Sequence, residues 1–181
     1  MNEDLKADTL EIEGKYLTFN LMEEFYGVSV DWILQIIGIT DTAITKIPKT
    51  PHFVKGVVNL RGKIIPVIDL RLRFKLPAQD YNERTSIVII KMKTEKSELY
   101  IGIIVDNVLE VLDIHSAEIE QTPSFGVDLD THFILGMAKV KNKVVSLLNM
   151  KEVLTNIELQ TEGVVSTQNE PFKCPIQNQP A

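Results

Sequence analysis

Residues 56–74 read Gly-Val-Val-Asn-Leu-Arg-Gly-Lys-Ile-Ile-Pro-Val-Ile-Asp-Leu-Arg-Leu-Arg-Phe. Two apolar runs rich in β-branched residues flank the pair Arg61 and Gly62, and this pattern predicts a β-hairpin. Pro66 interrupts the second run and cannot donate a ladder hydrogen bond, so we expect it on an edge strand or at an unbonded position. Asp69 closes the run and can cap a short helical turn. Arg61 occupies the tip, where a side chain points away from the core.

The same pattern returns 80 positions later, in residues 136–154. Gly62 corresponds there to Asn142, and glycine and asparagine are the residues that most readily accept a left-handed backbone. Further upstream, residues 27–37 resemble residues 102–112 at an offset of 75, and a short insertion in the second copy accounts for the change of offset. The sequence therefore predicts two related β units.

The composition is that of a globular chain with a sizeable core. The 181 residues include 44% hydrophobic and 24% charged side chains, which allows one domain or two closely joined halves. The net charge is -6, whereas a generic nucleic-acid or anionic-membrane binder is expected to be basic. Cys174 is the only cysteine, which excludes an intramolecular disulfide. The chain shows no signal-like opening and no apolar run of the roughly 20 residues that span a bilayer, so we expect a cytoplasmic protein.

Alternating apolar and polar residues predict the remaining strands. We expect strands at residues 16–21, 25–30, 31–37, 87–92 and 99–106. A short helix is expected to begin at Asn149 and to reach about Leu159. Residues 1–14 are expected to be flexible, and residues 160–181, rich in glutamine, asparagine and proline, are expected to be disordered. The folded domain then spans residues 15–159.

Four stretches together carry a family pattern: residues 56–71, Tyr26-Gly27, Pro123-x-Phe125 and Leu135-Gly136. They resemble the signature of the chemotaxis coupling proteins, the CheW family, over roughly residues 15–154. The resemblance implies an all-β fold of two intertwined five-stranded SH3-like β-barrels with short helical turns and a short C-terminal helix. It also implies a non-enzymatic adaptor that couples the cytoplasmic tips of methyl-accepting chemoreceptors to the regulatory domain of the histidine kinase CheA. Such an adaptor is cytoplasmic and is recruited to membrane-bound receptor arrays without inserting into the membrane.

The resemblance further implies a receptor-binding groove between the two halves. By that resemblance, its lining residues are Ile33, Gln35, Ile37, Arg61 and Val108. The kinase is expected at an outer end of the first half, at Ile44, Thr45 and Lys46. A small barrel leaves strand edges and a groove that suit strand addition or a docked helix. The family usually carries an acidic residue where this chain has Gln35, so an uncharged hydrogen bond would replace an ion pair with Arg61.

Several of these residues also have a purely structural explanation. Ile33 and Val108 are equivalent in the repeat, and buried core is the commoner role for such residues. Arg61 could equally bind the carbonyl groups of its own turn, and Thr45 and Lys46 could belong to a solvated loop. The binding assignments and these structural alternatives both remain open from sequence alone.

Other classes of function find little support in the sequence. Asp128, Asp130 and His132 superficially suggest a metal site, but His132 corresponds to His52 in a copy without those acids, so we expect no metal. The chain has no nucleophile and base constellation and no glycine-rich phosphate loop, so neither an enzyme nor a cofactor is expected. The alternative to a chemotaxis adaptor is an SH3-like interaction module of another pathway, either a non-chemotaxis chemosensory array or a nucleic-acid-associated barrel.

Overall fold

The computed structural model describes residues 12–93, 97–120 and 131–155. The chain divides into two compact units, residues 1–149 and 150–181. The strands of the first unit are β1 (Gly14–Leu21), β2 (Glu24–Ser29), β3 (Ile33–Gly38), β4 (Val54–Leu60), β5 (Lys63–Asp69), β6 (Ser86–Lys93), β7 (Glu98–Val105), β8 (Asn107–Ile114), β9 (Ile119–Glu120), β10 (Ile134–Val140) and β11 (Lys143–Leu148). Its helical turns are η1 (Val30–Trp32), η2 (Ile39–Asp41), α2 (Leu70–Arg73), η3 (Ser116–Glu118) and η4 (Thr131–Phe133).

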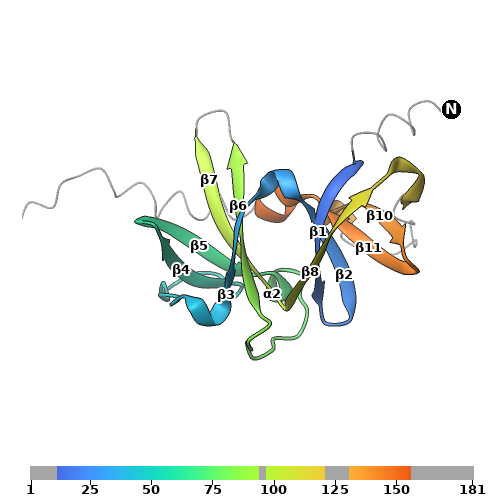
Figure 1. Ribbon diagram of the computed structural model, residues 1–181. Helices are drawn as coiled ribbons and strands as arrows, with labels where there is room; N and C mark the ends of the chain where they lie inside the picture. Colours follow the sequence, from blue (N-terminus) through green and yellow to red (C-terminus); the bar gives the residue numbers. More distant parts are fainter. Residues whose placement is uncertain (1–11, 94–96, 121–130, 156–181) are drawn as a thin grey trace, which may run out of the picture. The chain divides into compact units, whose positions relative to one another are not determined.

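These strands form two sheets, and each sheet takes strands from both copies of the repeat (Figure 1). Sheet A has the order β8-β1-β2-β11-β10-β9, and sheet B has the order β3-β6-β7-β5-β4. Most neighbours are antiparallel, but β2 with β11 and β5 with β7 are parallel. The chain passes from sheet A to sheet B after β2 and returns after β7. The prediction of an all-β fold made of two intertwined units is confirmed.

The internal repeat is also visible in the strand register. In sheet B, Val67 of β5 pairs with Gly102 of β7, and in sheet A, Leu147 of β11 pairs with Gly27 of β2. Leu147 and Gly27 are the repeat equivalents of Val67 and Gly102, so the two parallel ladders have the same register. A Cβ atom on Gly102 would lie 3.2 Å from the Val67 side chain, and one on Gly27 would lie 3.1 Å from the Leu147 side chain. These glycines let the neighbouring strand pack closely in both sheets.

The two hairpins of the repeat share one turn conformation. Arg61 and Gly62 join β4 to β5 with φ angles of 52° and 83°, and Lys141 and Asn142 join β10 to β11 with φ angles of 49° and 62°. Two successive residues with positive φ are typical of the type I′ turn, which suits the twist of the flanking strands. Arg61 and Gly62 are therefore both left-handed, and the special backbone conformation of this turn does not depend on the glycine alone.

Of the two positions expected for Pro66, the edge strand is wrong and the unbonded position agrees with the structure. β5 lies inside sheet B, between β7 and β4. Pro66 pairs with Val57 of β4, and the register with β7 begins one residue later, at Val67. Pro66, which has no N–H group to donate, therefore precedes the first residue of β5 that pairs with β7.

Each sheet has its own apolar cluster. The buried members in sheet A are Tyr16, Ile114, Ile119, Ala138, Val145 and Leu147. The buried members in sheet B are Val58, Ile65, Val67, Ile87, Ile89 and Ile104. Three residues of one cluster, Val58, Ile65 and Val67, are the repeat equivalents of three residues of the other. The two copies thus contribute the same strand faces to these two clusters, and the burial of each large aliphatic side chain stabilises the fold by about 1.5–3 kcal/mol.

In the second unit, residues 150–155 are helical, as expected for a helix that begins near Asn149. The predicted extension to Leu159 and the predicted disorder of residues 160–181 lie outside the described residues, as do residues 1–11 of the predicted flexible start. Within the described part of the chain, no helix has both the length and the apolar character that crossing a bilayer would require.

Candidate interaction surface

Two edge strands carry exposed apolar side chains. Among the described strands, β3 ends sheet B and β8 ends sheet A. Leu34 and Ile36 of β3 are 51% and 42% exposed, and Leu109 and Val111 of β8 are 41% and 52% exposed. Leu109 and Val111 are the repeat equivalents of Leu34 and Ile36. Isolated exposed aliphatic residues need no explanation, but alternating ones along two unpaired strand edges form a surface that suits a protein partner.

Of the residues predicted to bind the receptor on β3, Gln35 and Ile37 lie on the face opposite to Ile36, because they pair with Ile89 and Ile87 of β6 whereas Ile36 pairs with Val88. The register shifts between Ile33 and Gln35, so Ile33 pairs with Ile90 and does not share their face. All three predicted residues are half-buried. Ile37 packs against the apolar cluster of sheet B. Val108 of β8 is likewise half-buried and pairs with Phe19 of β1. The assignment of these residues to a receptor surface stays a prediction.

Sequence reasoning missed the four exposed residues of the two edges, Leu34, Ile36, Leu109 and Val111. The offset of 75 and the alternation were both readable in the sequence. Neither one tells which face of a strand is covered, because that depends on the position of the strand in its sheet.

Arg61 is exposed at the tip of the β4–β5 hairpin. Neither a hydrogen bond nor an ion pair joins its side chain to another of the described residues. Its neighbour Lys63 is engaged, with Nζ 4.4 Å from the centroid of the Tyr100 ring. The Arg61 guanidinium is therefore a cation that a partner can approach.

The residues predicted to bind the kinase cover the outer edge of β4. The Thr45 N–H donates to the Val57 carbonyl at 2.8 Å, and the Val57 N–H donates to the Thr45 carbonyl at 2.9 Å. Ile44 packs against the apolar cluster of sheet B, whereas Thr45 and Lys46 are exposed. β3 and β4 are opposite ends of the strand order in sheet B, so the two predicted surfaces lie on different edges.

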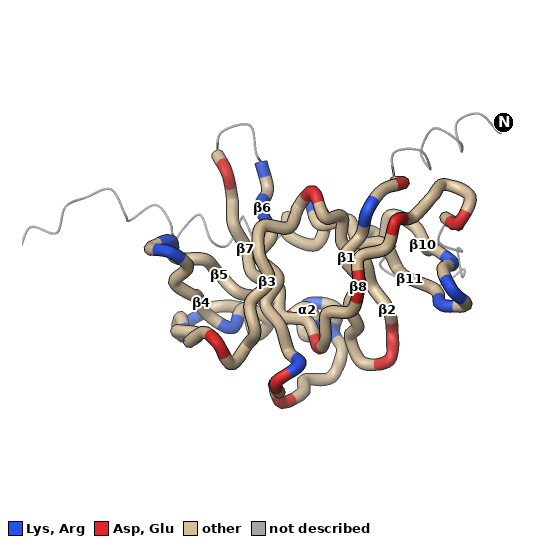
Figure 2. Tube along the Cα trace, viewed as in Figure 1, with Lys and Arg blue, Asp and Glu red and all other residues tan. Residues whose placement is uncertain are grey.

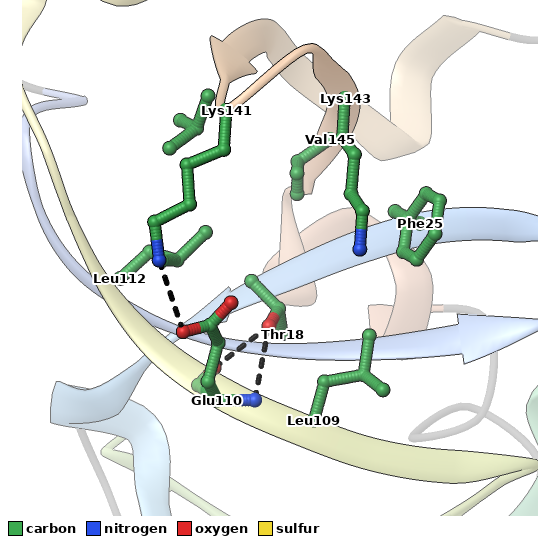
Figure 3. Close-up of a pocket in the computed structure, with 9 residues that line it drawn as sticks. Thr18, Phe25, Leu109, Glu110, Leu112, Lys141, Lys143 and Val145 are labelled. Carbon is green, nitrogen blue, oxygen red and sulfur yellow. Dashed lines mark hydrogen bonds and ion pairs between the residues drawn. The ribbon is translucent and has the colours of Figure 1, made fainter.

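A hollow of about 40 Å³ opens between β8 and the β10–β11 hairpin (Figure 3). It is lined by Thr18, Phe25, Leu109, Glu110, Leu112, Val140, Lys141, Lys143 and Val145. Lys141 Nζ lies 3.4 Å from Glu110 Oε2, and Lys143 Nζ lies 4.6 Å from the centroid of the Phe25 ring. The charges around this hollow therefore pair with one another or with an aromatic ring.

Positive charge gathers at the tips of the β4–β5 and β10–β11 hairpins of this acidic chain (Figure 2). Gln35 and Arg61 are the repeat equivalents of Glu110 and Lys141. The second copy forms an ion pair between these positions, and the first copy cannot, because Gln35 is uncharged. Among the described residues, no carboxylate forms an ion pair with Arg61.

Two interleaved sheets with exposed apolar edges define a β-rich protein-interaction module. Among the described residues, no cluster of three or more His, Cys, Asp or Glu side chains is placed to hold a metal ion. The CheW-like domain model matches residues 15–158, and the chain belongs to this family of chemotaxis adaptor proteins.

Known relatives resemble the chain over most of their length. The chemotaxis protein CheW of Thermotoga maritima is 34% identical over 161 residues, which is 87% of this chain and 97% of that protein. The chemotaxis protein CheW of Bacillus subtilis is 33% identical over 141 residues, which is 77% of this chain and 86% of that protein. A crystal structure of the scaffolding protein TtCheW from Thermoanaerobacter tengcongensis matches with a TM-score of 0.66 and 37% identity, covering 76% of this chain and 89% of that chain. The family resemblance and the fold class predicted from sequence are confirmed.

Proposed function

We propose that this protein is a non-enzymatic adaptor that couples the cytoplasmic tip of a chemoreceptor to the histidine kinase CheA. Its membership in the CheW-like family supports the proposal, because the relatives carry the names chemotaxis protein and scaffolding protein. In this role the protein acts in the cytoplasm, at membrane-bound receptor arrays, through protein surfaces alone.

The exposed aliphatic residues of β3 and β8 are the single observation that best supports a docked receptor helix. A helix that lies along both edges would cover Leu34, Ile36, Leu109 and Val111, each of which is about half exposed. Covering the exposed half of four such side chains is worth roughly 3–6 kcal/mol before the costs of association. These four side chains can therefore supply only part of the binding energy, and Arg61 adds a charged anchor for a partner carboxylate.

The kinase contact falls on the other edge of sheet B. Thr45 and Lys46 are exposed beside β4, at the opposite end of the strand order from β3. Two partners on opposite edges of one sheet can bind at the same time, which is what a coupling protein requires.

A matched pair of substitutions tests the receptor surface. Leu109 of β8 and Leu135 of β10 are the same residue type with 41% and 40% exposure. Leu109→Glu places a charge in the proposed contact and is expected to weaken binding to a purified receptor-tip fragment at least tenfold, whereas Leu135→Glu is expected to leave it unchanged. Isothermal titration calorimetry gives both affinities, and thermal melting confirms that both variants are folded.

The same titrations carried out with the CheA regulatory domain test the second surface. Lys46→Glu is expected to weaken kinase binding, and Leu109→Glu is expected to spare it. If neither wild-type titration shows binding, the coupling function is wrong. If Leu135→Glu weakens receptor binding as much as Leu109→Glu does, the receptor surface is misassigned.

A further inference from the structure

A single residue, Asp106, separates β7 of sheet B from β8 of sheet A. Its backbone N–H donates to the Asn20 carbonyl of β1 at 3.2 Å. Its carboxylate oxygen Oδ2 accepts a hydrogen bond of 2.7 Å from the N–H of Met22, in the turn between β1 and β2. Asp106 therefore stands at the point where the chain changes sheets, and two hydrogen bonds attach it to sheet A.

Arg71 reaches the same carboxylate from the side of sheet B. It lies in α2, which follows β5 directly. Its Nε donates to Asp106 Oδ1 at 2.7 Å, and its Nη2 donates to Oδ2 at 2.5 Å, which makes a bidentate pair. Bidentate pairs between arginine and a carboxylate are the strongest and most directional hydrogen-bonded contacts between side chains. The hydrogen bond to Asp106 also raises the pKa of Arg71, so the guanidinium stays charged.

The other N–H groups of the Arg71 guanidinium bind the segment between α2 and β6, which links the two copies of the repeat. Nη1 donates to the Pro77 carbonyl at 3.0 Å, and Nη2 also donates to Gln79 Oε1. The Arg71 side chain is only 8% exposed. A buried guanidinium with three partner residues on two segments tolerates little displacement, because each lost partner leaves an unsatisfied donor.

The other crossing between the sheets is built differently. The chain passes from β2 to β3 through η1, whose central residue, Asp31, is the repeat equivalent of Asp106. Asp31 is exposed, and Ser29 caps the turn by accepting a hydrogen bond from its N–H. The repeat alone therefore does not require a buried ion pair at a crossing, and the contact at Asp106 calls for its own explanation.

We propose that Arg71 and Asp106 form a positioning pair that fixes how β8 is held relative to β3. β8 starts at Asn107, immediately after Asp106, while Arg71 is attached to sheet B, of which β3 is an edge. The consequence for binding rests on the proposed function. A receptor helix that touches both edges needs one particular spacing between them. When that spacing fluctuates, only a fraction of the molecules can bind the helix, and the apparent affinity is reduced in proportion to that fraction.

The direct test is a distance measurement without any partner. Nitroxide labels on Cys residues at exposed Lys93 of β6 and exposed Asp113 of β8, in a Cys174→Ser background, report the separation of the sheets by double electron–electron resonance. The labelled protein with Arg71 and Asp106 unchanged is expected to give one narrow distance distribution. Arg71→Met is expected to broaden it, and Arg71→Lys, which keeps the charge but loses the fork, is expected to give an intermediate width.

A double variant separates positioning from stability. Arg71→Met leaves the Asp106 carboxylate without its partner and is expected to lower the melting temperature. Arg71→Met with Asp106→Asn removes that unpaired charge and is expected to recover most of the melting temperature while the distribution stays broad. Receptor-tip affinity is expected to stay at least tenfold weakened in both variants. Kinase-domain affinity is expected to change less than threefold, because residues 44–46 are attached to β4.

Neutralising an exposed pair is the matched control. Lys139 and Glu120 form an ion pair whose side chains are 61% and 63% exposed, so Lys139→Met with Glu120→Gln is expected to leave the distribution and both affinities unchanged. A narrow distribution in Arg71→Met overturns the positioning pair whatever the affinities are. A broad distribution with unchanged receptor affinity supports the positioning pair and overturns the receptor surface instead.

Discussion

Replacing Gly56 by alanine is expected to detach the loop of residues 44–46 from β4. Gly56 has a φ angle of 140°, and a Cβ atom built there would lie 2.1 Å from the Thr45 carbonyl oxygen and 2.8 Å from its carbonyl carbon. Both atoms belong to the backbone, so no change of side-chain rotamer can relieve the contact. The loop must move away, and the two hydrogen bonds between Thr45 and Val57 must lengthen or break.

The cost can be estimated from these contacts. Two backbone hydrogen bonds contribute roughly 0.5–1.5 kcal/mol each, and a positive φ angle costs an alanine roughly 1–2 kcal/mol. The free energy of unfolding is therefore expected to fall by about 2–5 kcal/mol, a large part of the 5–15 kcal/mol typical of a domain. At roughly 2–4 °C per kcal/mol for a chain of this size, the melting temperature is expected to fall by about 4–20 °C.

Gly62→Ala is the matched control, since Gly62 has a φ angle of 83° but no atom lies within 4 Å of the position that a Cβ atom would occupy there. It is expected to show only the conformational cost, about 1–2 kcal/mol. Calorimetric melting of both variants, with affinities for the kinase domain and the receptor tip, gives the comparison. Gly56→Ala is expected to weaken kinase binding more than receptor binding. Equal melting temperatures for the two variants would refute the close contact between Gly56 and Thr45.

Three further predictions concern single features. Arg61→Ala is expected to weaken receptor-tip binding about five- to thirtyfold, or about 1–2 kcal/mol, and to leave the melting temperature unchanged. If the variant loses kinase binding and keeps receptor binding, the two surfaces are interchanged. Burial and the hydrogen bond that Tyr81 donates to Asp69 raise the pKa of Tyr81, so the folded state holds that proton more tightly than the unfolded state. Stability is expected to fall as the pH rises above about 10, and Tyr81→Phe is expected to flatten that fall in urea titrations; an unchanged slope would contradict the assignment. Deleting residues 161–181, which lie beyond the family match at residues 15–158, is expected to leave melting and both affinities intact, and a tenfold loss would reveal a binding tail.

Local signals in the sequence predicted the elements of the fold well. The apolar runs around Arg61 and Gly62 and around Lys141 and Asn142 form the two expected hairpins, because turn residues and strand alternation act over a few positions. The pairing of the elements is not a local property. Nothing around Pro66 shows that β7 will pair beside it, so the sequence left an edge strand and an unbonded interior position both open.

The candidate surface was less predictable for the same reason. The resemblance nominated Ile33, Gln35 and Ile37, and the structure exposes instead the residues between them, Leu34 and Ile36. The sequence of a strand shows which residues share a face, but which of the two faces is covered depends on what packs against the sheet. Arg71 and Asp106 are 35 residues apart, and no short-range pattern connects them.

The internal repeat allows the two halves to be compared within one molecule. Lys63 lies over Tyr100 in the first copy, and its equivalent, Lys143, lies over Phe25 in the second, with Nζ 4.4 Å and 4.6 Å from the ring centroids. Because the hairpins and the aromatic rings beneath their lysines correspond so closely, the two halves offer the same framework at this end. They differ at the edge-strand position whose side chain pairs with the hairpin cation in the second copy.

In the second copy that residue is Glu110, which pairs with Lys141, and in the first it is Gln35, which leaves the charge of Arg61 to be met from outside. An exposed internal pair contributes little stability, so the loss of one costs the fold almost nothing. A cation kept unpaired at a rim can raise both the rate and the specificity with which an acidic partner binds. Because position 35 is neutral, we expect the first half to be the one whose hairpin cation, Arg61, meets an acidic partner.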